Sequence, residues 1–232
     1  MTNDLNQQRA IQLIAKDVLA AIGSTINALD TEDSIAQRAI QMMKASGIHE
    51  TWYYNCPAFV LLGSRSRISQ SGRVYQAANE PVGTTNLVTI DLSPMRDGLW
   101  GDCARSFCIE NGQHTANPMN DDFIEGLAAQ KALHEAMRDF VKPSTTFEEL
   151  YIDANQKINA LGFENLDFAS NLGHSIVLNR DDRVYIESSN QMTLGSIKFF
   201  TFEPHIAAIG SRWGFKHEQI YFFNPGGLLE VL

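Results

Sequence analysis

The sequence has few cysteines, no long apolar run and no excess of positive charge. The three cysteines, Cys56, Cys103 and Cys108, are an odd set whose spacing matches neither a disulfide framework nor a zinc finger. No apolar run approaches the length of a membrane span, and the first residues, Met-Thr-Asn-Asp-Leu, lack the basic and apolar regions of a signal peptide. We therefore expect free thiols in a cytoplasmic protein that does not insert into membranes.

The acidic balance of the chain argues against a nucleic-acid partner. The sequence holds 18 Lys and Arg residues against 27 Asp and Glu residues, a formal net charge of −9, whereas a nucleic-acid surface needs a basic stripe. The 232 residues can bury a sizeable core, and no linker, low-complexity tract or charge block divides them. We expect a single catalytic domain over residues 1–232, with the N-terminal helices of residues 1–50 packed as part of it.

Apolar periodicity predicts a mixed α+β protein. Helices are expected over 4–22, from the cap at Asp30-Thr31 to Gly47, from Asn117-Pro118 to about Phe140, and after Thr146, which forms a capping box with Glu149. Apolar and β-branched runs predict strands at 59–62, 87–92, 99–109, 175–178, 184–186, 197–203 and 215–223.

Four acidic residues interrupt these predicted strands in two hairpins. A turn centred between residues 96 and 97 would place Asp91 opposite Asp102, and a turn centred at residues 210–211 would place Glu203 opposite Glu218. A bulge would shift either register by one residue. Carboxylates that face each other across an antiparallel pair repel, and burying them alone is costly.

Bound cations would remove this cost. Two divalent ions neutralise four carboxylates, and His174, in the segment Gly-His-Ser-Ile between the two hairpins, adds an imidazole ligand. The sequence therefore predicts a dinuclear metal site. Carboxylates with one imidazole suit manganese, cobalt, zinc or iron.

The same residues carry a resemblance to a known family. The segment 88–109 resembles the paired-aspartate hairpin of the pita-bread metallopeptidases, which include methionine aminopeptidase, aminopeptidase P, prolidase and the metal-free creatinase. Gly173-His174, Thr201-Phe202-Glu203-Pro204 and Lys216-His217-Glu218 resemble the later ligand segments, in the family's order. The resemblance covers about residues 85–223. It implies the pita-bread fold, in which helices back a curved antiparallel sheet in pseudo-twofold halves, with the site on the concave face.

The resemblance also implies roles for the five ligands. Asp91 would chelate one metal, Asp102 and Glu218 would bridge both, and His174 and Glu203 would complete the shell of the other metal. His174 and Glu203 are thus also the implied catalytic residues, with Glu203 as the proton shuttle for a metal-bridging hydroxide. The implied activity is hydrolysis of a small peptide or a peptide-like amide.

Two departures from the family keep the function open. The family's two further histidines are missing: residues 69–75, upstream of Asp91, contain none, and Asp181 stands where the second would follow His174. Lys216, His205 and Arg73 are the candidates for binding substrate instead, and Lys216, two residues before Glu218, is expected to share the face of that residue. Besides the aminopeptidase or Xaa-Pro peptidase type of hydrolase, two alternatives stay open. They are a metal-dependent enzyme of a different reaction on a small carboxylated metabolite, and a non-catalytic peptidase-like binding protein. A homodimer, common in the aminopeptidase P branch, is one open oligomeric state.

Overall fold

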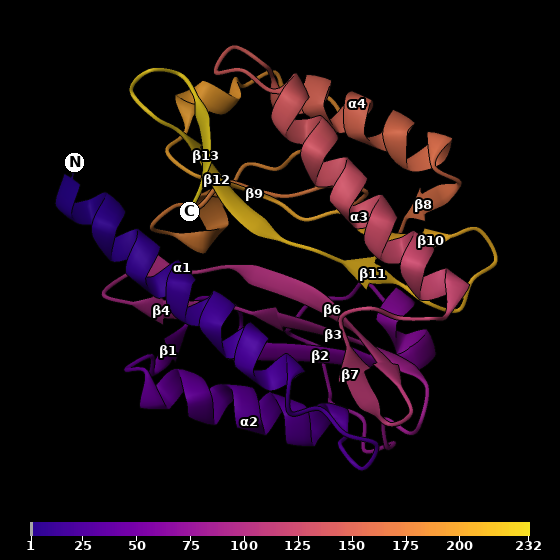
Figure 1. Ribbon diagram of the computed structural model, residues 1–232. Coiled ribbons are helices and arrows are strands. Elements are labelled where there is room, and N and C mark those ends of the chain that lie inside the picture. Colours follow the sequence, from indigo (N-terminus) through magenta and orange to yellow (C-terminus); the bar gives the residue numbers. More distant parts are fainter. Residues whose placement is uncertain (1) are drawn as a thin grey trace.

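Two pairs of helices enclose the strands of the protein (Figure 1). The computed structural model describes residues 2–232. Helices α1 (Thr2–Gly23) and α2 (Glu32–Ala45) come from the N-terminal half, and α3 (Asp121–Phe140) and α4 (Phe147–Ala160) come from the C-terminal half. In Figure 1, α3 and α4 lie on one side of the strands and α2 lies on the other. No helix within residues 2–232 is long and apolar enough to cross a bilayer.

The strands pair antiparallel throughout. The orders are β2-β3-β6-β7, β1-β4-β5, β11-β10-β8 and β13-β12-β9. The strand bounds are β1 (Glu50–Thr51), β2 (Ala58–Leu62), β3 (Asn86–Leu92), β4 (Pro94–Arg96), β5 (Leu99–Trp100), β6 (Cys103–Glu110), β7 (Gln113–Thr115), β8 (Phe163–Asn165), β9 (Phe200–Phe202), β10 (His205–Ala208), β11 (Phe215–Lys216), β12 (Gln219–Phe223) and β13 (Leu229–Val231).

The alternation of β3 separates the core from the site. Val88 and Ile90 are fully buried in the cluster that also holds residues of α1 and α2. Thr89 and Asp91, on the opposite face, line a cavity instead. Helices α3 and α4 bury a second cluster with β9, which includes Leu133, Leu150 and Phe200, among others. The two helix pairs thus cover the outer faces of the strands and leave an inner face for polar side chains.

The first acidic hairpin has a different register from the predicted one. Asp91 pairs with Ala104, not with Asp102, and Arg96 pairs with Leu99. The turn is at Asp97 and Gly98, whose φ angles of 53° and 75° suit the two-residue turn that matches strand twist. The predicted turn centre was one residue too early. Because Asp102 precedes Ala104 by two positions, it still lies on the face of Asp91.

The second acidic hairpin has the predicted register. Phe202 pairs with Gln219 and His205 pairs with Lys216, and this common register places Glu203 opposite Glu218. The ladder breaks between the two pairings because Pro204 has no N–H to donate.

Two local predictions differ from the structure. Helix α3 begins at Asp121, because the Asn120 side chain caps it by accepting from the Asp122 backbone N–H at 3.0 Å. The strands expected at 175–178 and 184–186 are reduced to isolated bridges, with the 3₁₀ turn η2 (Arg180–Asp182) between them. The capping box of Thr146 and Glu149 is confirmed.

A buried histidine predicts a pH dependence of stability. In α3, His134 Nε2 donates to the His217 carbonyl at 3.0 Å, and Nδ1 lies 2.8 Å from the Tyr221 hydroxyl. Burial lowers the pKa of His134 to about 4. The unfolded state therefore binds the proton first as pH falls, and stability is lost between about pH 6.5 and 4.

We expect this residue to account for about 3 kcal/mol of that loss. The measurement is urea unfolding of the wild type and His134→Gln at several pH values. Between about pH 6.5 and 4, the free energy of unfolding of the variant should fall by about 3 kcal/mol less than that of the wild type. Parallel pH profiles for the two proteins would show that His134 is not the titrating group.

Candidate metal centre

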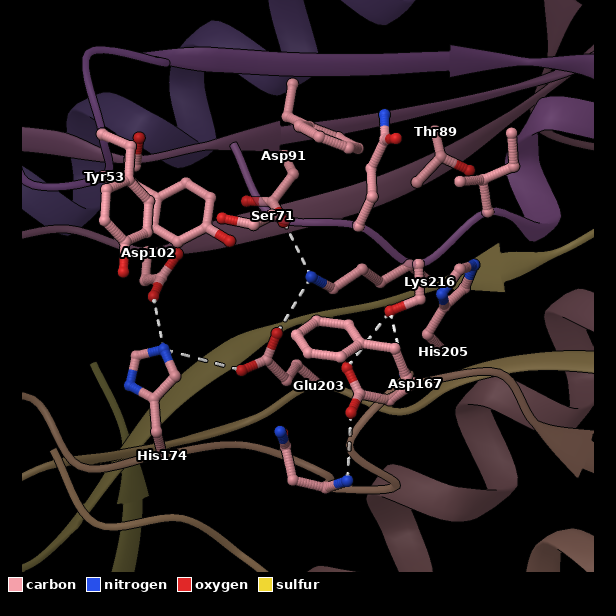
Figure 2. Close-up of a pocket in the computed structure, with 18 of the residues that line it drawn as sticks. Tyr53, Ser71, Thr89, Asp91, Asp102, Asp167, His174, Glu203, His205 and Lys216 are labelled. Carbon is pink, nitrogen blue, oxygen red and sulfur yellow. Dashed lines mark hydrogen bonds and ion pairs between the residues drawn. The ribbon is translucent and has the colours of Figure 1, made fainter. Parts of the chain in front are cut away.

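The inner face of the strands opens into a cavity of about 230 Å³. The acidic and imidazole side chains of both halves meet there (Figure 2). Four of the five predicted ligands line the cavity, and Glu218 is buried beside it. The structure therefore brings together residues that are more than 100 positions apart in the sequence, Asp91 and Glu218 among them.

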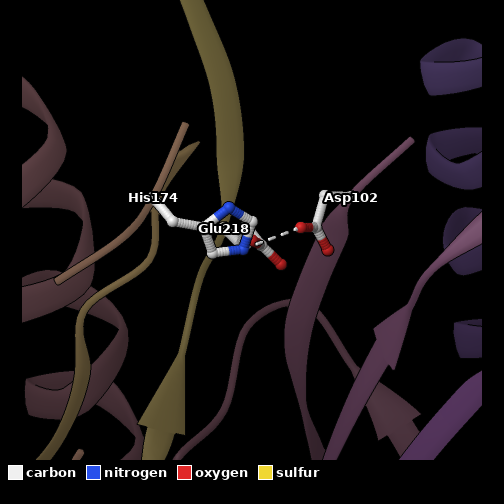
Figure 3. A group of neighbouring side chains, drawn as sticks. All are labelled: Asp102, His174 and Glu218. Carbon is white, nitrogen blue, oxygen red and sulfur yellow. Dashed lines mark ion pairs between the residues drawn. The ribbon is translucent and has the colours of Figure 1, made fainter. Parts of the chain in front are cut away.

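Three predicted ligands form a close cluster (Figure 3). One ligand atom each from Asp102, His174 and Glu218 lies within 4.8 Å of the other two, and all three residues are buried. Within residues 2–232, Asp102 Oδ2 and both carboxylate oxygens of Glu218 have no hydrogen-bond partner. A buried carboxylate without a partner is strongly disfavoured. A divalent cation fits this donor set.

His174 has the tautomer that a metal ligand needs. Its Nδ1 lies 3.0 Å from the Ser175 carbonyl, which can only accept, so Nδ1 carries the proton. Its Nε2 faces Asp102 Oδ2 at 3.4 Å and Glu203 Oε1 at 3.7 Å. A hydrogen bond from the far nitrogen to a carbonyl is a common support for a metal-bound histidine.

The carboxyl groups differ in how they hold a proton. Burial raises the pKa of Asp102 to about 6. Burial, together with the neighbouring carboxylates Asp102, Glu203 and Asp91, raises the pKa of Glu218 well above its usual range. Burial also acts to raise the pKa of Glu203, but the Lys216 ammonium and His174 outweigh it and hold that pKa below its usual range. Glu203 is thus ionised at neutral pH.

A tight backbone contact positions His174. Gly173 has a φ of +145°, and a Cβ built on it would lie 2.2 Å from the Thr201 carbonyl oxygen. Next to it, the His174 backbone N–H donates to Thr201 Oγ1 at 2.9 Å, and that hydroxyl donates to Glu203 Oε1 at 3.1 Å. Thr201 therefore links the histidine to the glutamate.

We expect Gly173→Ala to destabilise the protein by about 3 kcal/mol or more, because both the φ angle and the Thr201 carbonyl oppose a Cβ. Gly210→Ala is the matched control: its φ is +82°, but no atom lies within 4 Å of the added Cβ. That change should cost only about 1 to 2 kcal/mol. Urea unfolding of both variants tests this, and equal losses would contradict the role of the contact.

Lys216 lies among the predicted ligands. Its Nζ is 2.7 Å from Asp91 Oδ2 and 2.9 Å from Glu203 Oε2, and the side chain is mostly buried. The sequence predicted that Lys216 shares a face with Glu218 and binds substrate. The structure shows that two of the predicted metal ligands already have this ammonium as a partner.

The other predicted substrate residues are placed differently. His205 lines the cavity, but its Nε2 donates to the Ser66 carbonyl at 2.6 Å, and burial lowers its pKa to about 4. Arg73 does not line the cavity; it is exposed, with its guanidinium 4.3 Å from the Tyr54 ring centre. Asp181, which stands where the family's second missing histidine would be, is exposed and does not line the cavity either.

Several lining residues were not predicted from the sequence. The Arg183 guanidinium lies 5.1 Å from the ring centre of Trp52 and 5.4 Å from that of Tyr185. Asp167 accepts from Ser69 Oγ at 3.3 Å, and burial raises its pKa. The run Trp-Tyr-Tyr at 52–54 was a visible signal of an aromatic wall. Asp167 and Arg183 lie in irregular segments, where no periodicity marks them.

The fold and the cluster together define a pita-bread protein with a candidate metal centre. Residues 6–225 match the sequence model of metallopeptidase family M24, so the chain belongs to this family. The comparison with curated proteins finds no match.

Solved structures of peptidases share the fold. An X-Pro aminopeptidase from Thermotoga maritima is 20% identical, with a TM-score of 0.82, and the match covers 100% of this chain and 61% of that one. A prolidase from Pyrococcus furiosus is 21% identical, with a TM-score of 0.78 and coverage of 100% and 64%. A methionine aminopeptidase from Rickettsia prowazekii is 14% identical, with a TM-score of 0.77 and coverage of 100% and 97%. The chain thus spans about three fifths of the X-Pro aminopeptidase and the prolidase.

Proposed function

We propose that this protein is a metal-dependent hydrolase that acts on small peptides or peptide-like amides. The observation that carries the proposal is the buried cluster of Asp102, His174 and Glu218, whose unpartnered oxygens face one another beside the cavity. Membership of family M24 and the similarity in fold to prolidase and X-Pro aminopeptidase support the substrate class. The three free, buried cysteines support a cytoplasmic location.

Asp102, His174 and Glu218 would hold the cation, with Glu203 beside them. When bound, a divalent ion polarises a carbonyl and lowers the pKa of a water towards neutrality. Glu203 is the proton acceptor in this proposal, because its ionised carboxylate lies next to His174 and is oriented by the Thr201 hydroxyl. The sequence also predicts a second ion, for which Asp91 would be a ligand. The ion pairs of Lys216 with Asp91 and Glu203 bear on whether the site binds one ion or two.

The cavity wall favours a short substrate with a negative end. Trp52, Tyr53 and Tyr185 supply apolar surface, and Arg183 supplies a positive charge held between two aromatic rings. A carboxylate of a short peptide would pair with Arg183 while the scissile amide lies near the cluster.

The test is hydrolysis by the purified protein after loading with manganese, cobalt or zinc. The panel contains Xaa-Pro dipeptides, other dipeptides, peptides that begin with methionine, and N-acetylated versions of each. We expect cleavage of short free peptides that a chelator abolishes and re-added metal restores. An absence of metal-dependent cleavage across the panel would contradict the proposal.

A metal-dependent reaction on a small carboxylated metabolite is the second candidate. Ser69, Gln70 and Ser71 line the cavity in the segment that lacks the family's first histidine, and Arg183 offers a carboxylate partner. Metal-dependent turnover of a carboxylated metabolite, without cleavage of any peptide, would favour this function over the first.

A further inference from the structure

The five predicted metal ligands divide into two groups with different surroundings. Asp102 and Glu218 have oxygens without partners and lie around His174 Nε2. Asp91 and Glu203 share the ammonium of Lys216, at 2.7 and 2.9 Å (Figure 2). One group therefore lacks a cation, whereas the other already contains one from the chain itself.

The ammonium and a second divalent ion would compete for the same oxygens. Metal ions in two-metal sites lie about 3.5–4 Å apart. An ion chelated by Asp91 and placed at that distance from the first would lie close to Lys216 Nζ, which is 2.7 Å from Asp91 Oδ2. The two positive charges would repel in a mostly buried site where water screens them little. The donor set fits one divalent ion at the Asp102 cluster and does not fit a second beside Asp91.

Total charge alone does not decide between one ion and two. With all four carboxylates ionised, one divalent ion and the ammonium leave one negative charge, whereas two divalent ions and the ammonium leave one positive charge. The preference for a single ion therefore comes from the two ion pairs of Lys216 with Asp91 and Glu203. Lys216 can reach Asp91 because β11 pairs with β10 in the register that places Lys216 opposite His205, on the face of Glu218.

We propose that the Lys216 ammonium takes the place of the second divalent cation, so that each chain binds one metal ion through Asp102, His174 and Glu218. This inference rests on the proposed function, since it concerns the ion of the same site. Lys216 is then a resident cation of the centre: it holds Asp91 and Glu203 in place by direct ion pairs. The site has the ligand residues of a two-metal centre but the occupancy of a one-metal centre.

The test is the number of manganese ions bound per chain. Metal-free wild type is titrated with Mn²⁺, and bound metal is counted by elemental analysis and by electron paramagnetic resonance. We expect one ion per chain and the spectrum of isolated ions. Two ions, with a spectrum broadened by coupling between neighbouring ions, would overturn the inference and leave the hydrolase proposal intact. No uptake would overturn both.

A lysine variant tests the role of the ammonium itself. Lys216→Met removes the charge and keeps most of the side-chain length, so we expect the number of bound Mn²⁺ ions to rise from one to two. Lys198→Met is the matched control, because Lys198 is exposed and pairs with Asp4, and neither residue lines the cavity; this variant should keep one ion. A folded Lys216→Met protein that still binds one ion would overturn the assignment. If the variant does not fold, the wild-type count decides the question.

Discussion

Asp102→Asn should weaken Mn²⁺ binding by more than about 100-fold, since even changes to residues behind metal ligands often cost 10- to 100-fold. Asp102 supplies one of the three clustered ligand atoms, and Asn offers a neutral oxygen or an N–H in its place. The same change should stabilise the metal-free protein. Asp102 is buried, and its pKa of about 6 means that the folded state resists its ionisation.

The sign of the stability effect follows from linkage. A carboxyl with a folded pKa above its unfolded value carries no penalty below about pH 4 and the full penalty above about pH 6. At pH 8 the metal-free variant should therefore be more stable than the metal-free wild type by up to about 3 kcal/mol. Excess Mn²⁺ should raise the melting temperature of the wild type but not that of the variant.

Calorimetric Mn²⁺ titration and thermal unfolding, with and without chelator, measure both effects. Asp139→Asn is the matched control, because Asp139 is an exposed aspartate on α3. It should behave as the wild type does. An Asp102→Asn variant that binds Mn²⁺ with undiminished affinity would contradict the role of Asp102 as a ligand.

Glu203→Gln should lower kcat by about 100- to 10,000-fold, the usual contribution of a positioned general base. Gln keeps the size of the side chain and can still accept from Thr201, but it cannot take up a proton. Asp102, His174 and Glu218 remain in the variant, so it should still bind a metal ion. The expected signature is a large loss of turnover with metal content preserved.

The measurement is kcat on the best substrate of the peptide panel, together with the metal content of the same preparation. Glu125→Gln, on the exposed surface of α3, is the control and should keep full activity. A Glu203→Gln protein with wild-type turnover would remove Glu203 from the chemistry. A protein that lost its metal would instead make Glu203 an essential ligand.

The sequence indicated which acidic and imidazole side chains lie near one another, but not which partners they have. Asp102 and Glu218 were singled out because acids in apolar strands are costly, and His174 because its segment lies between the two hairpins and resembles a ligand segment of the family. The second hairpin was correctly registered because its turn at 210–211 is clearly marked. The first was not, because the choice between adjacent turn centres depends on φ angles at Asp97 and Gly98 that the pattern does not reveal.

The position of Lys216 shows why the rest could not be predicted. Its place on the face of Glu218 followed from alternation, but its two ion pairs depend on how far β11 lies from β3 in space. That distance is set by the packing of β6 against β11, which no local pattern encodes. Asp167 and Arg183 were missed for the same reason, because irregular segments carry them to the cavity.

A crystal structure of the Mn²⁺-loaded protein, with anomalous scattering collected for manganese, tests the central claim most directly. We expect a strong anomalous peak between Asp102, His174 and Glu218, within coordination distance of His174 Nε2. Full loading without a peak at that position would contradict the account.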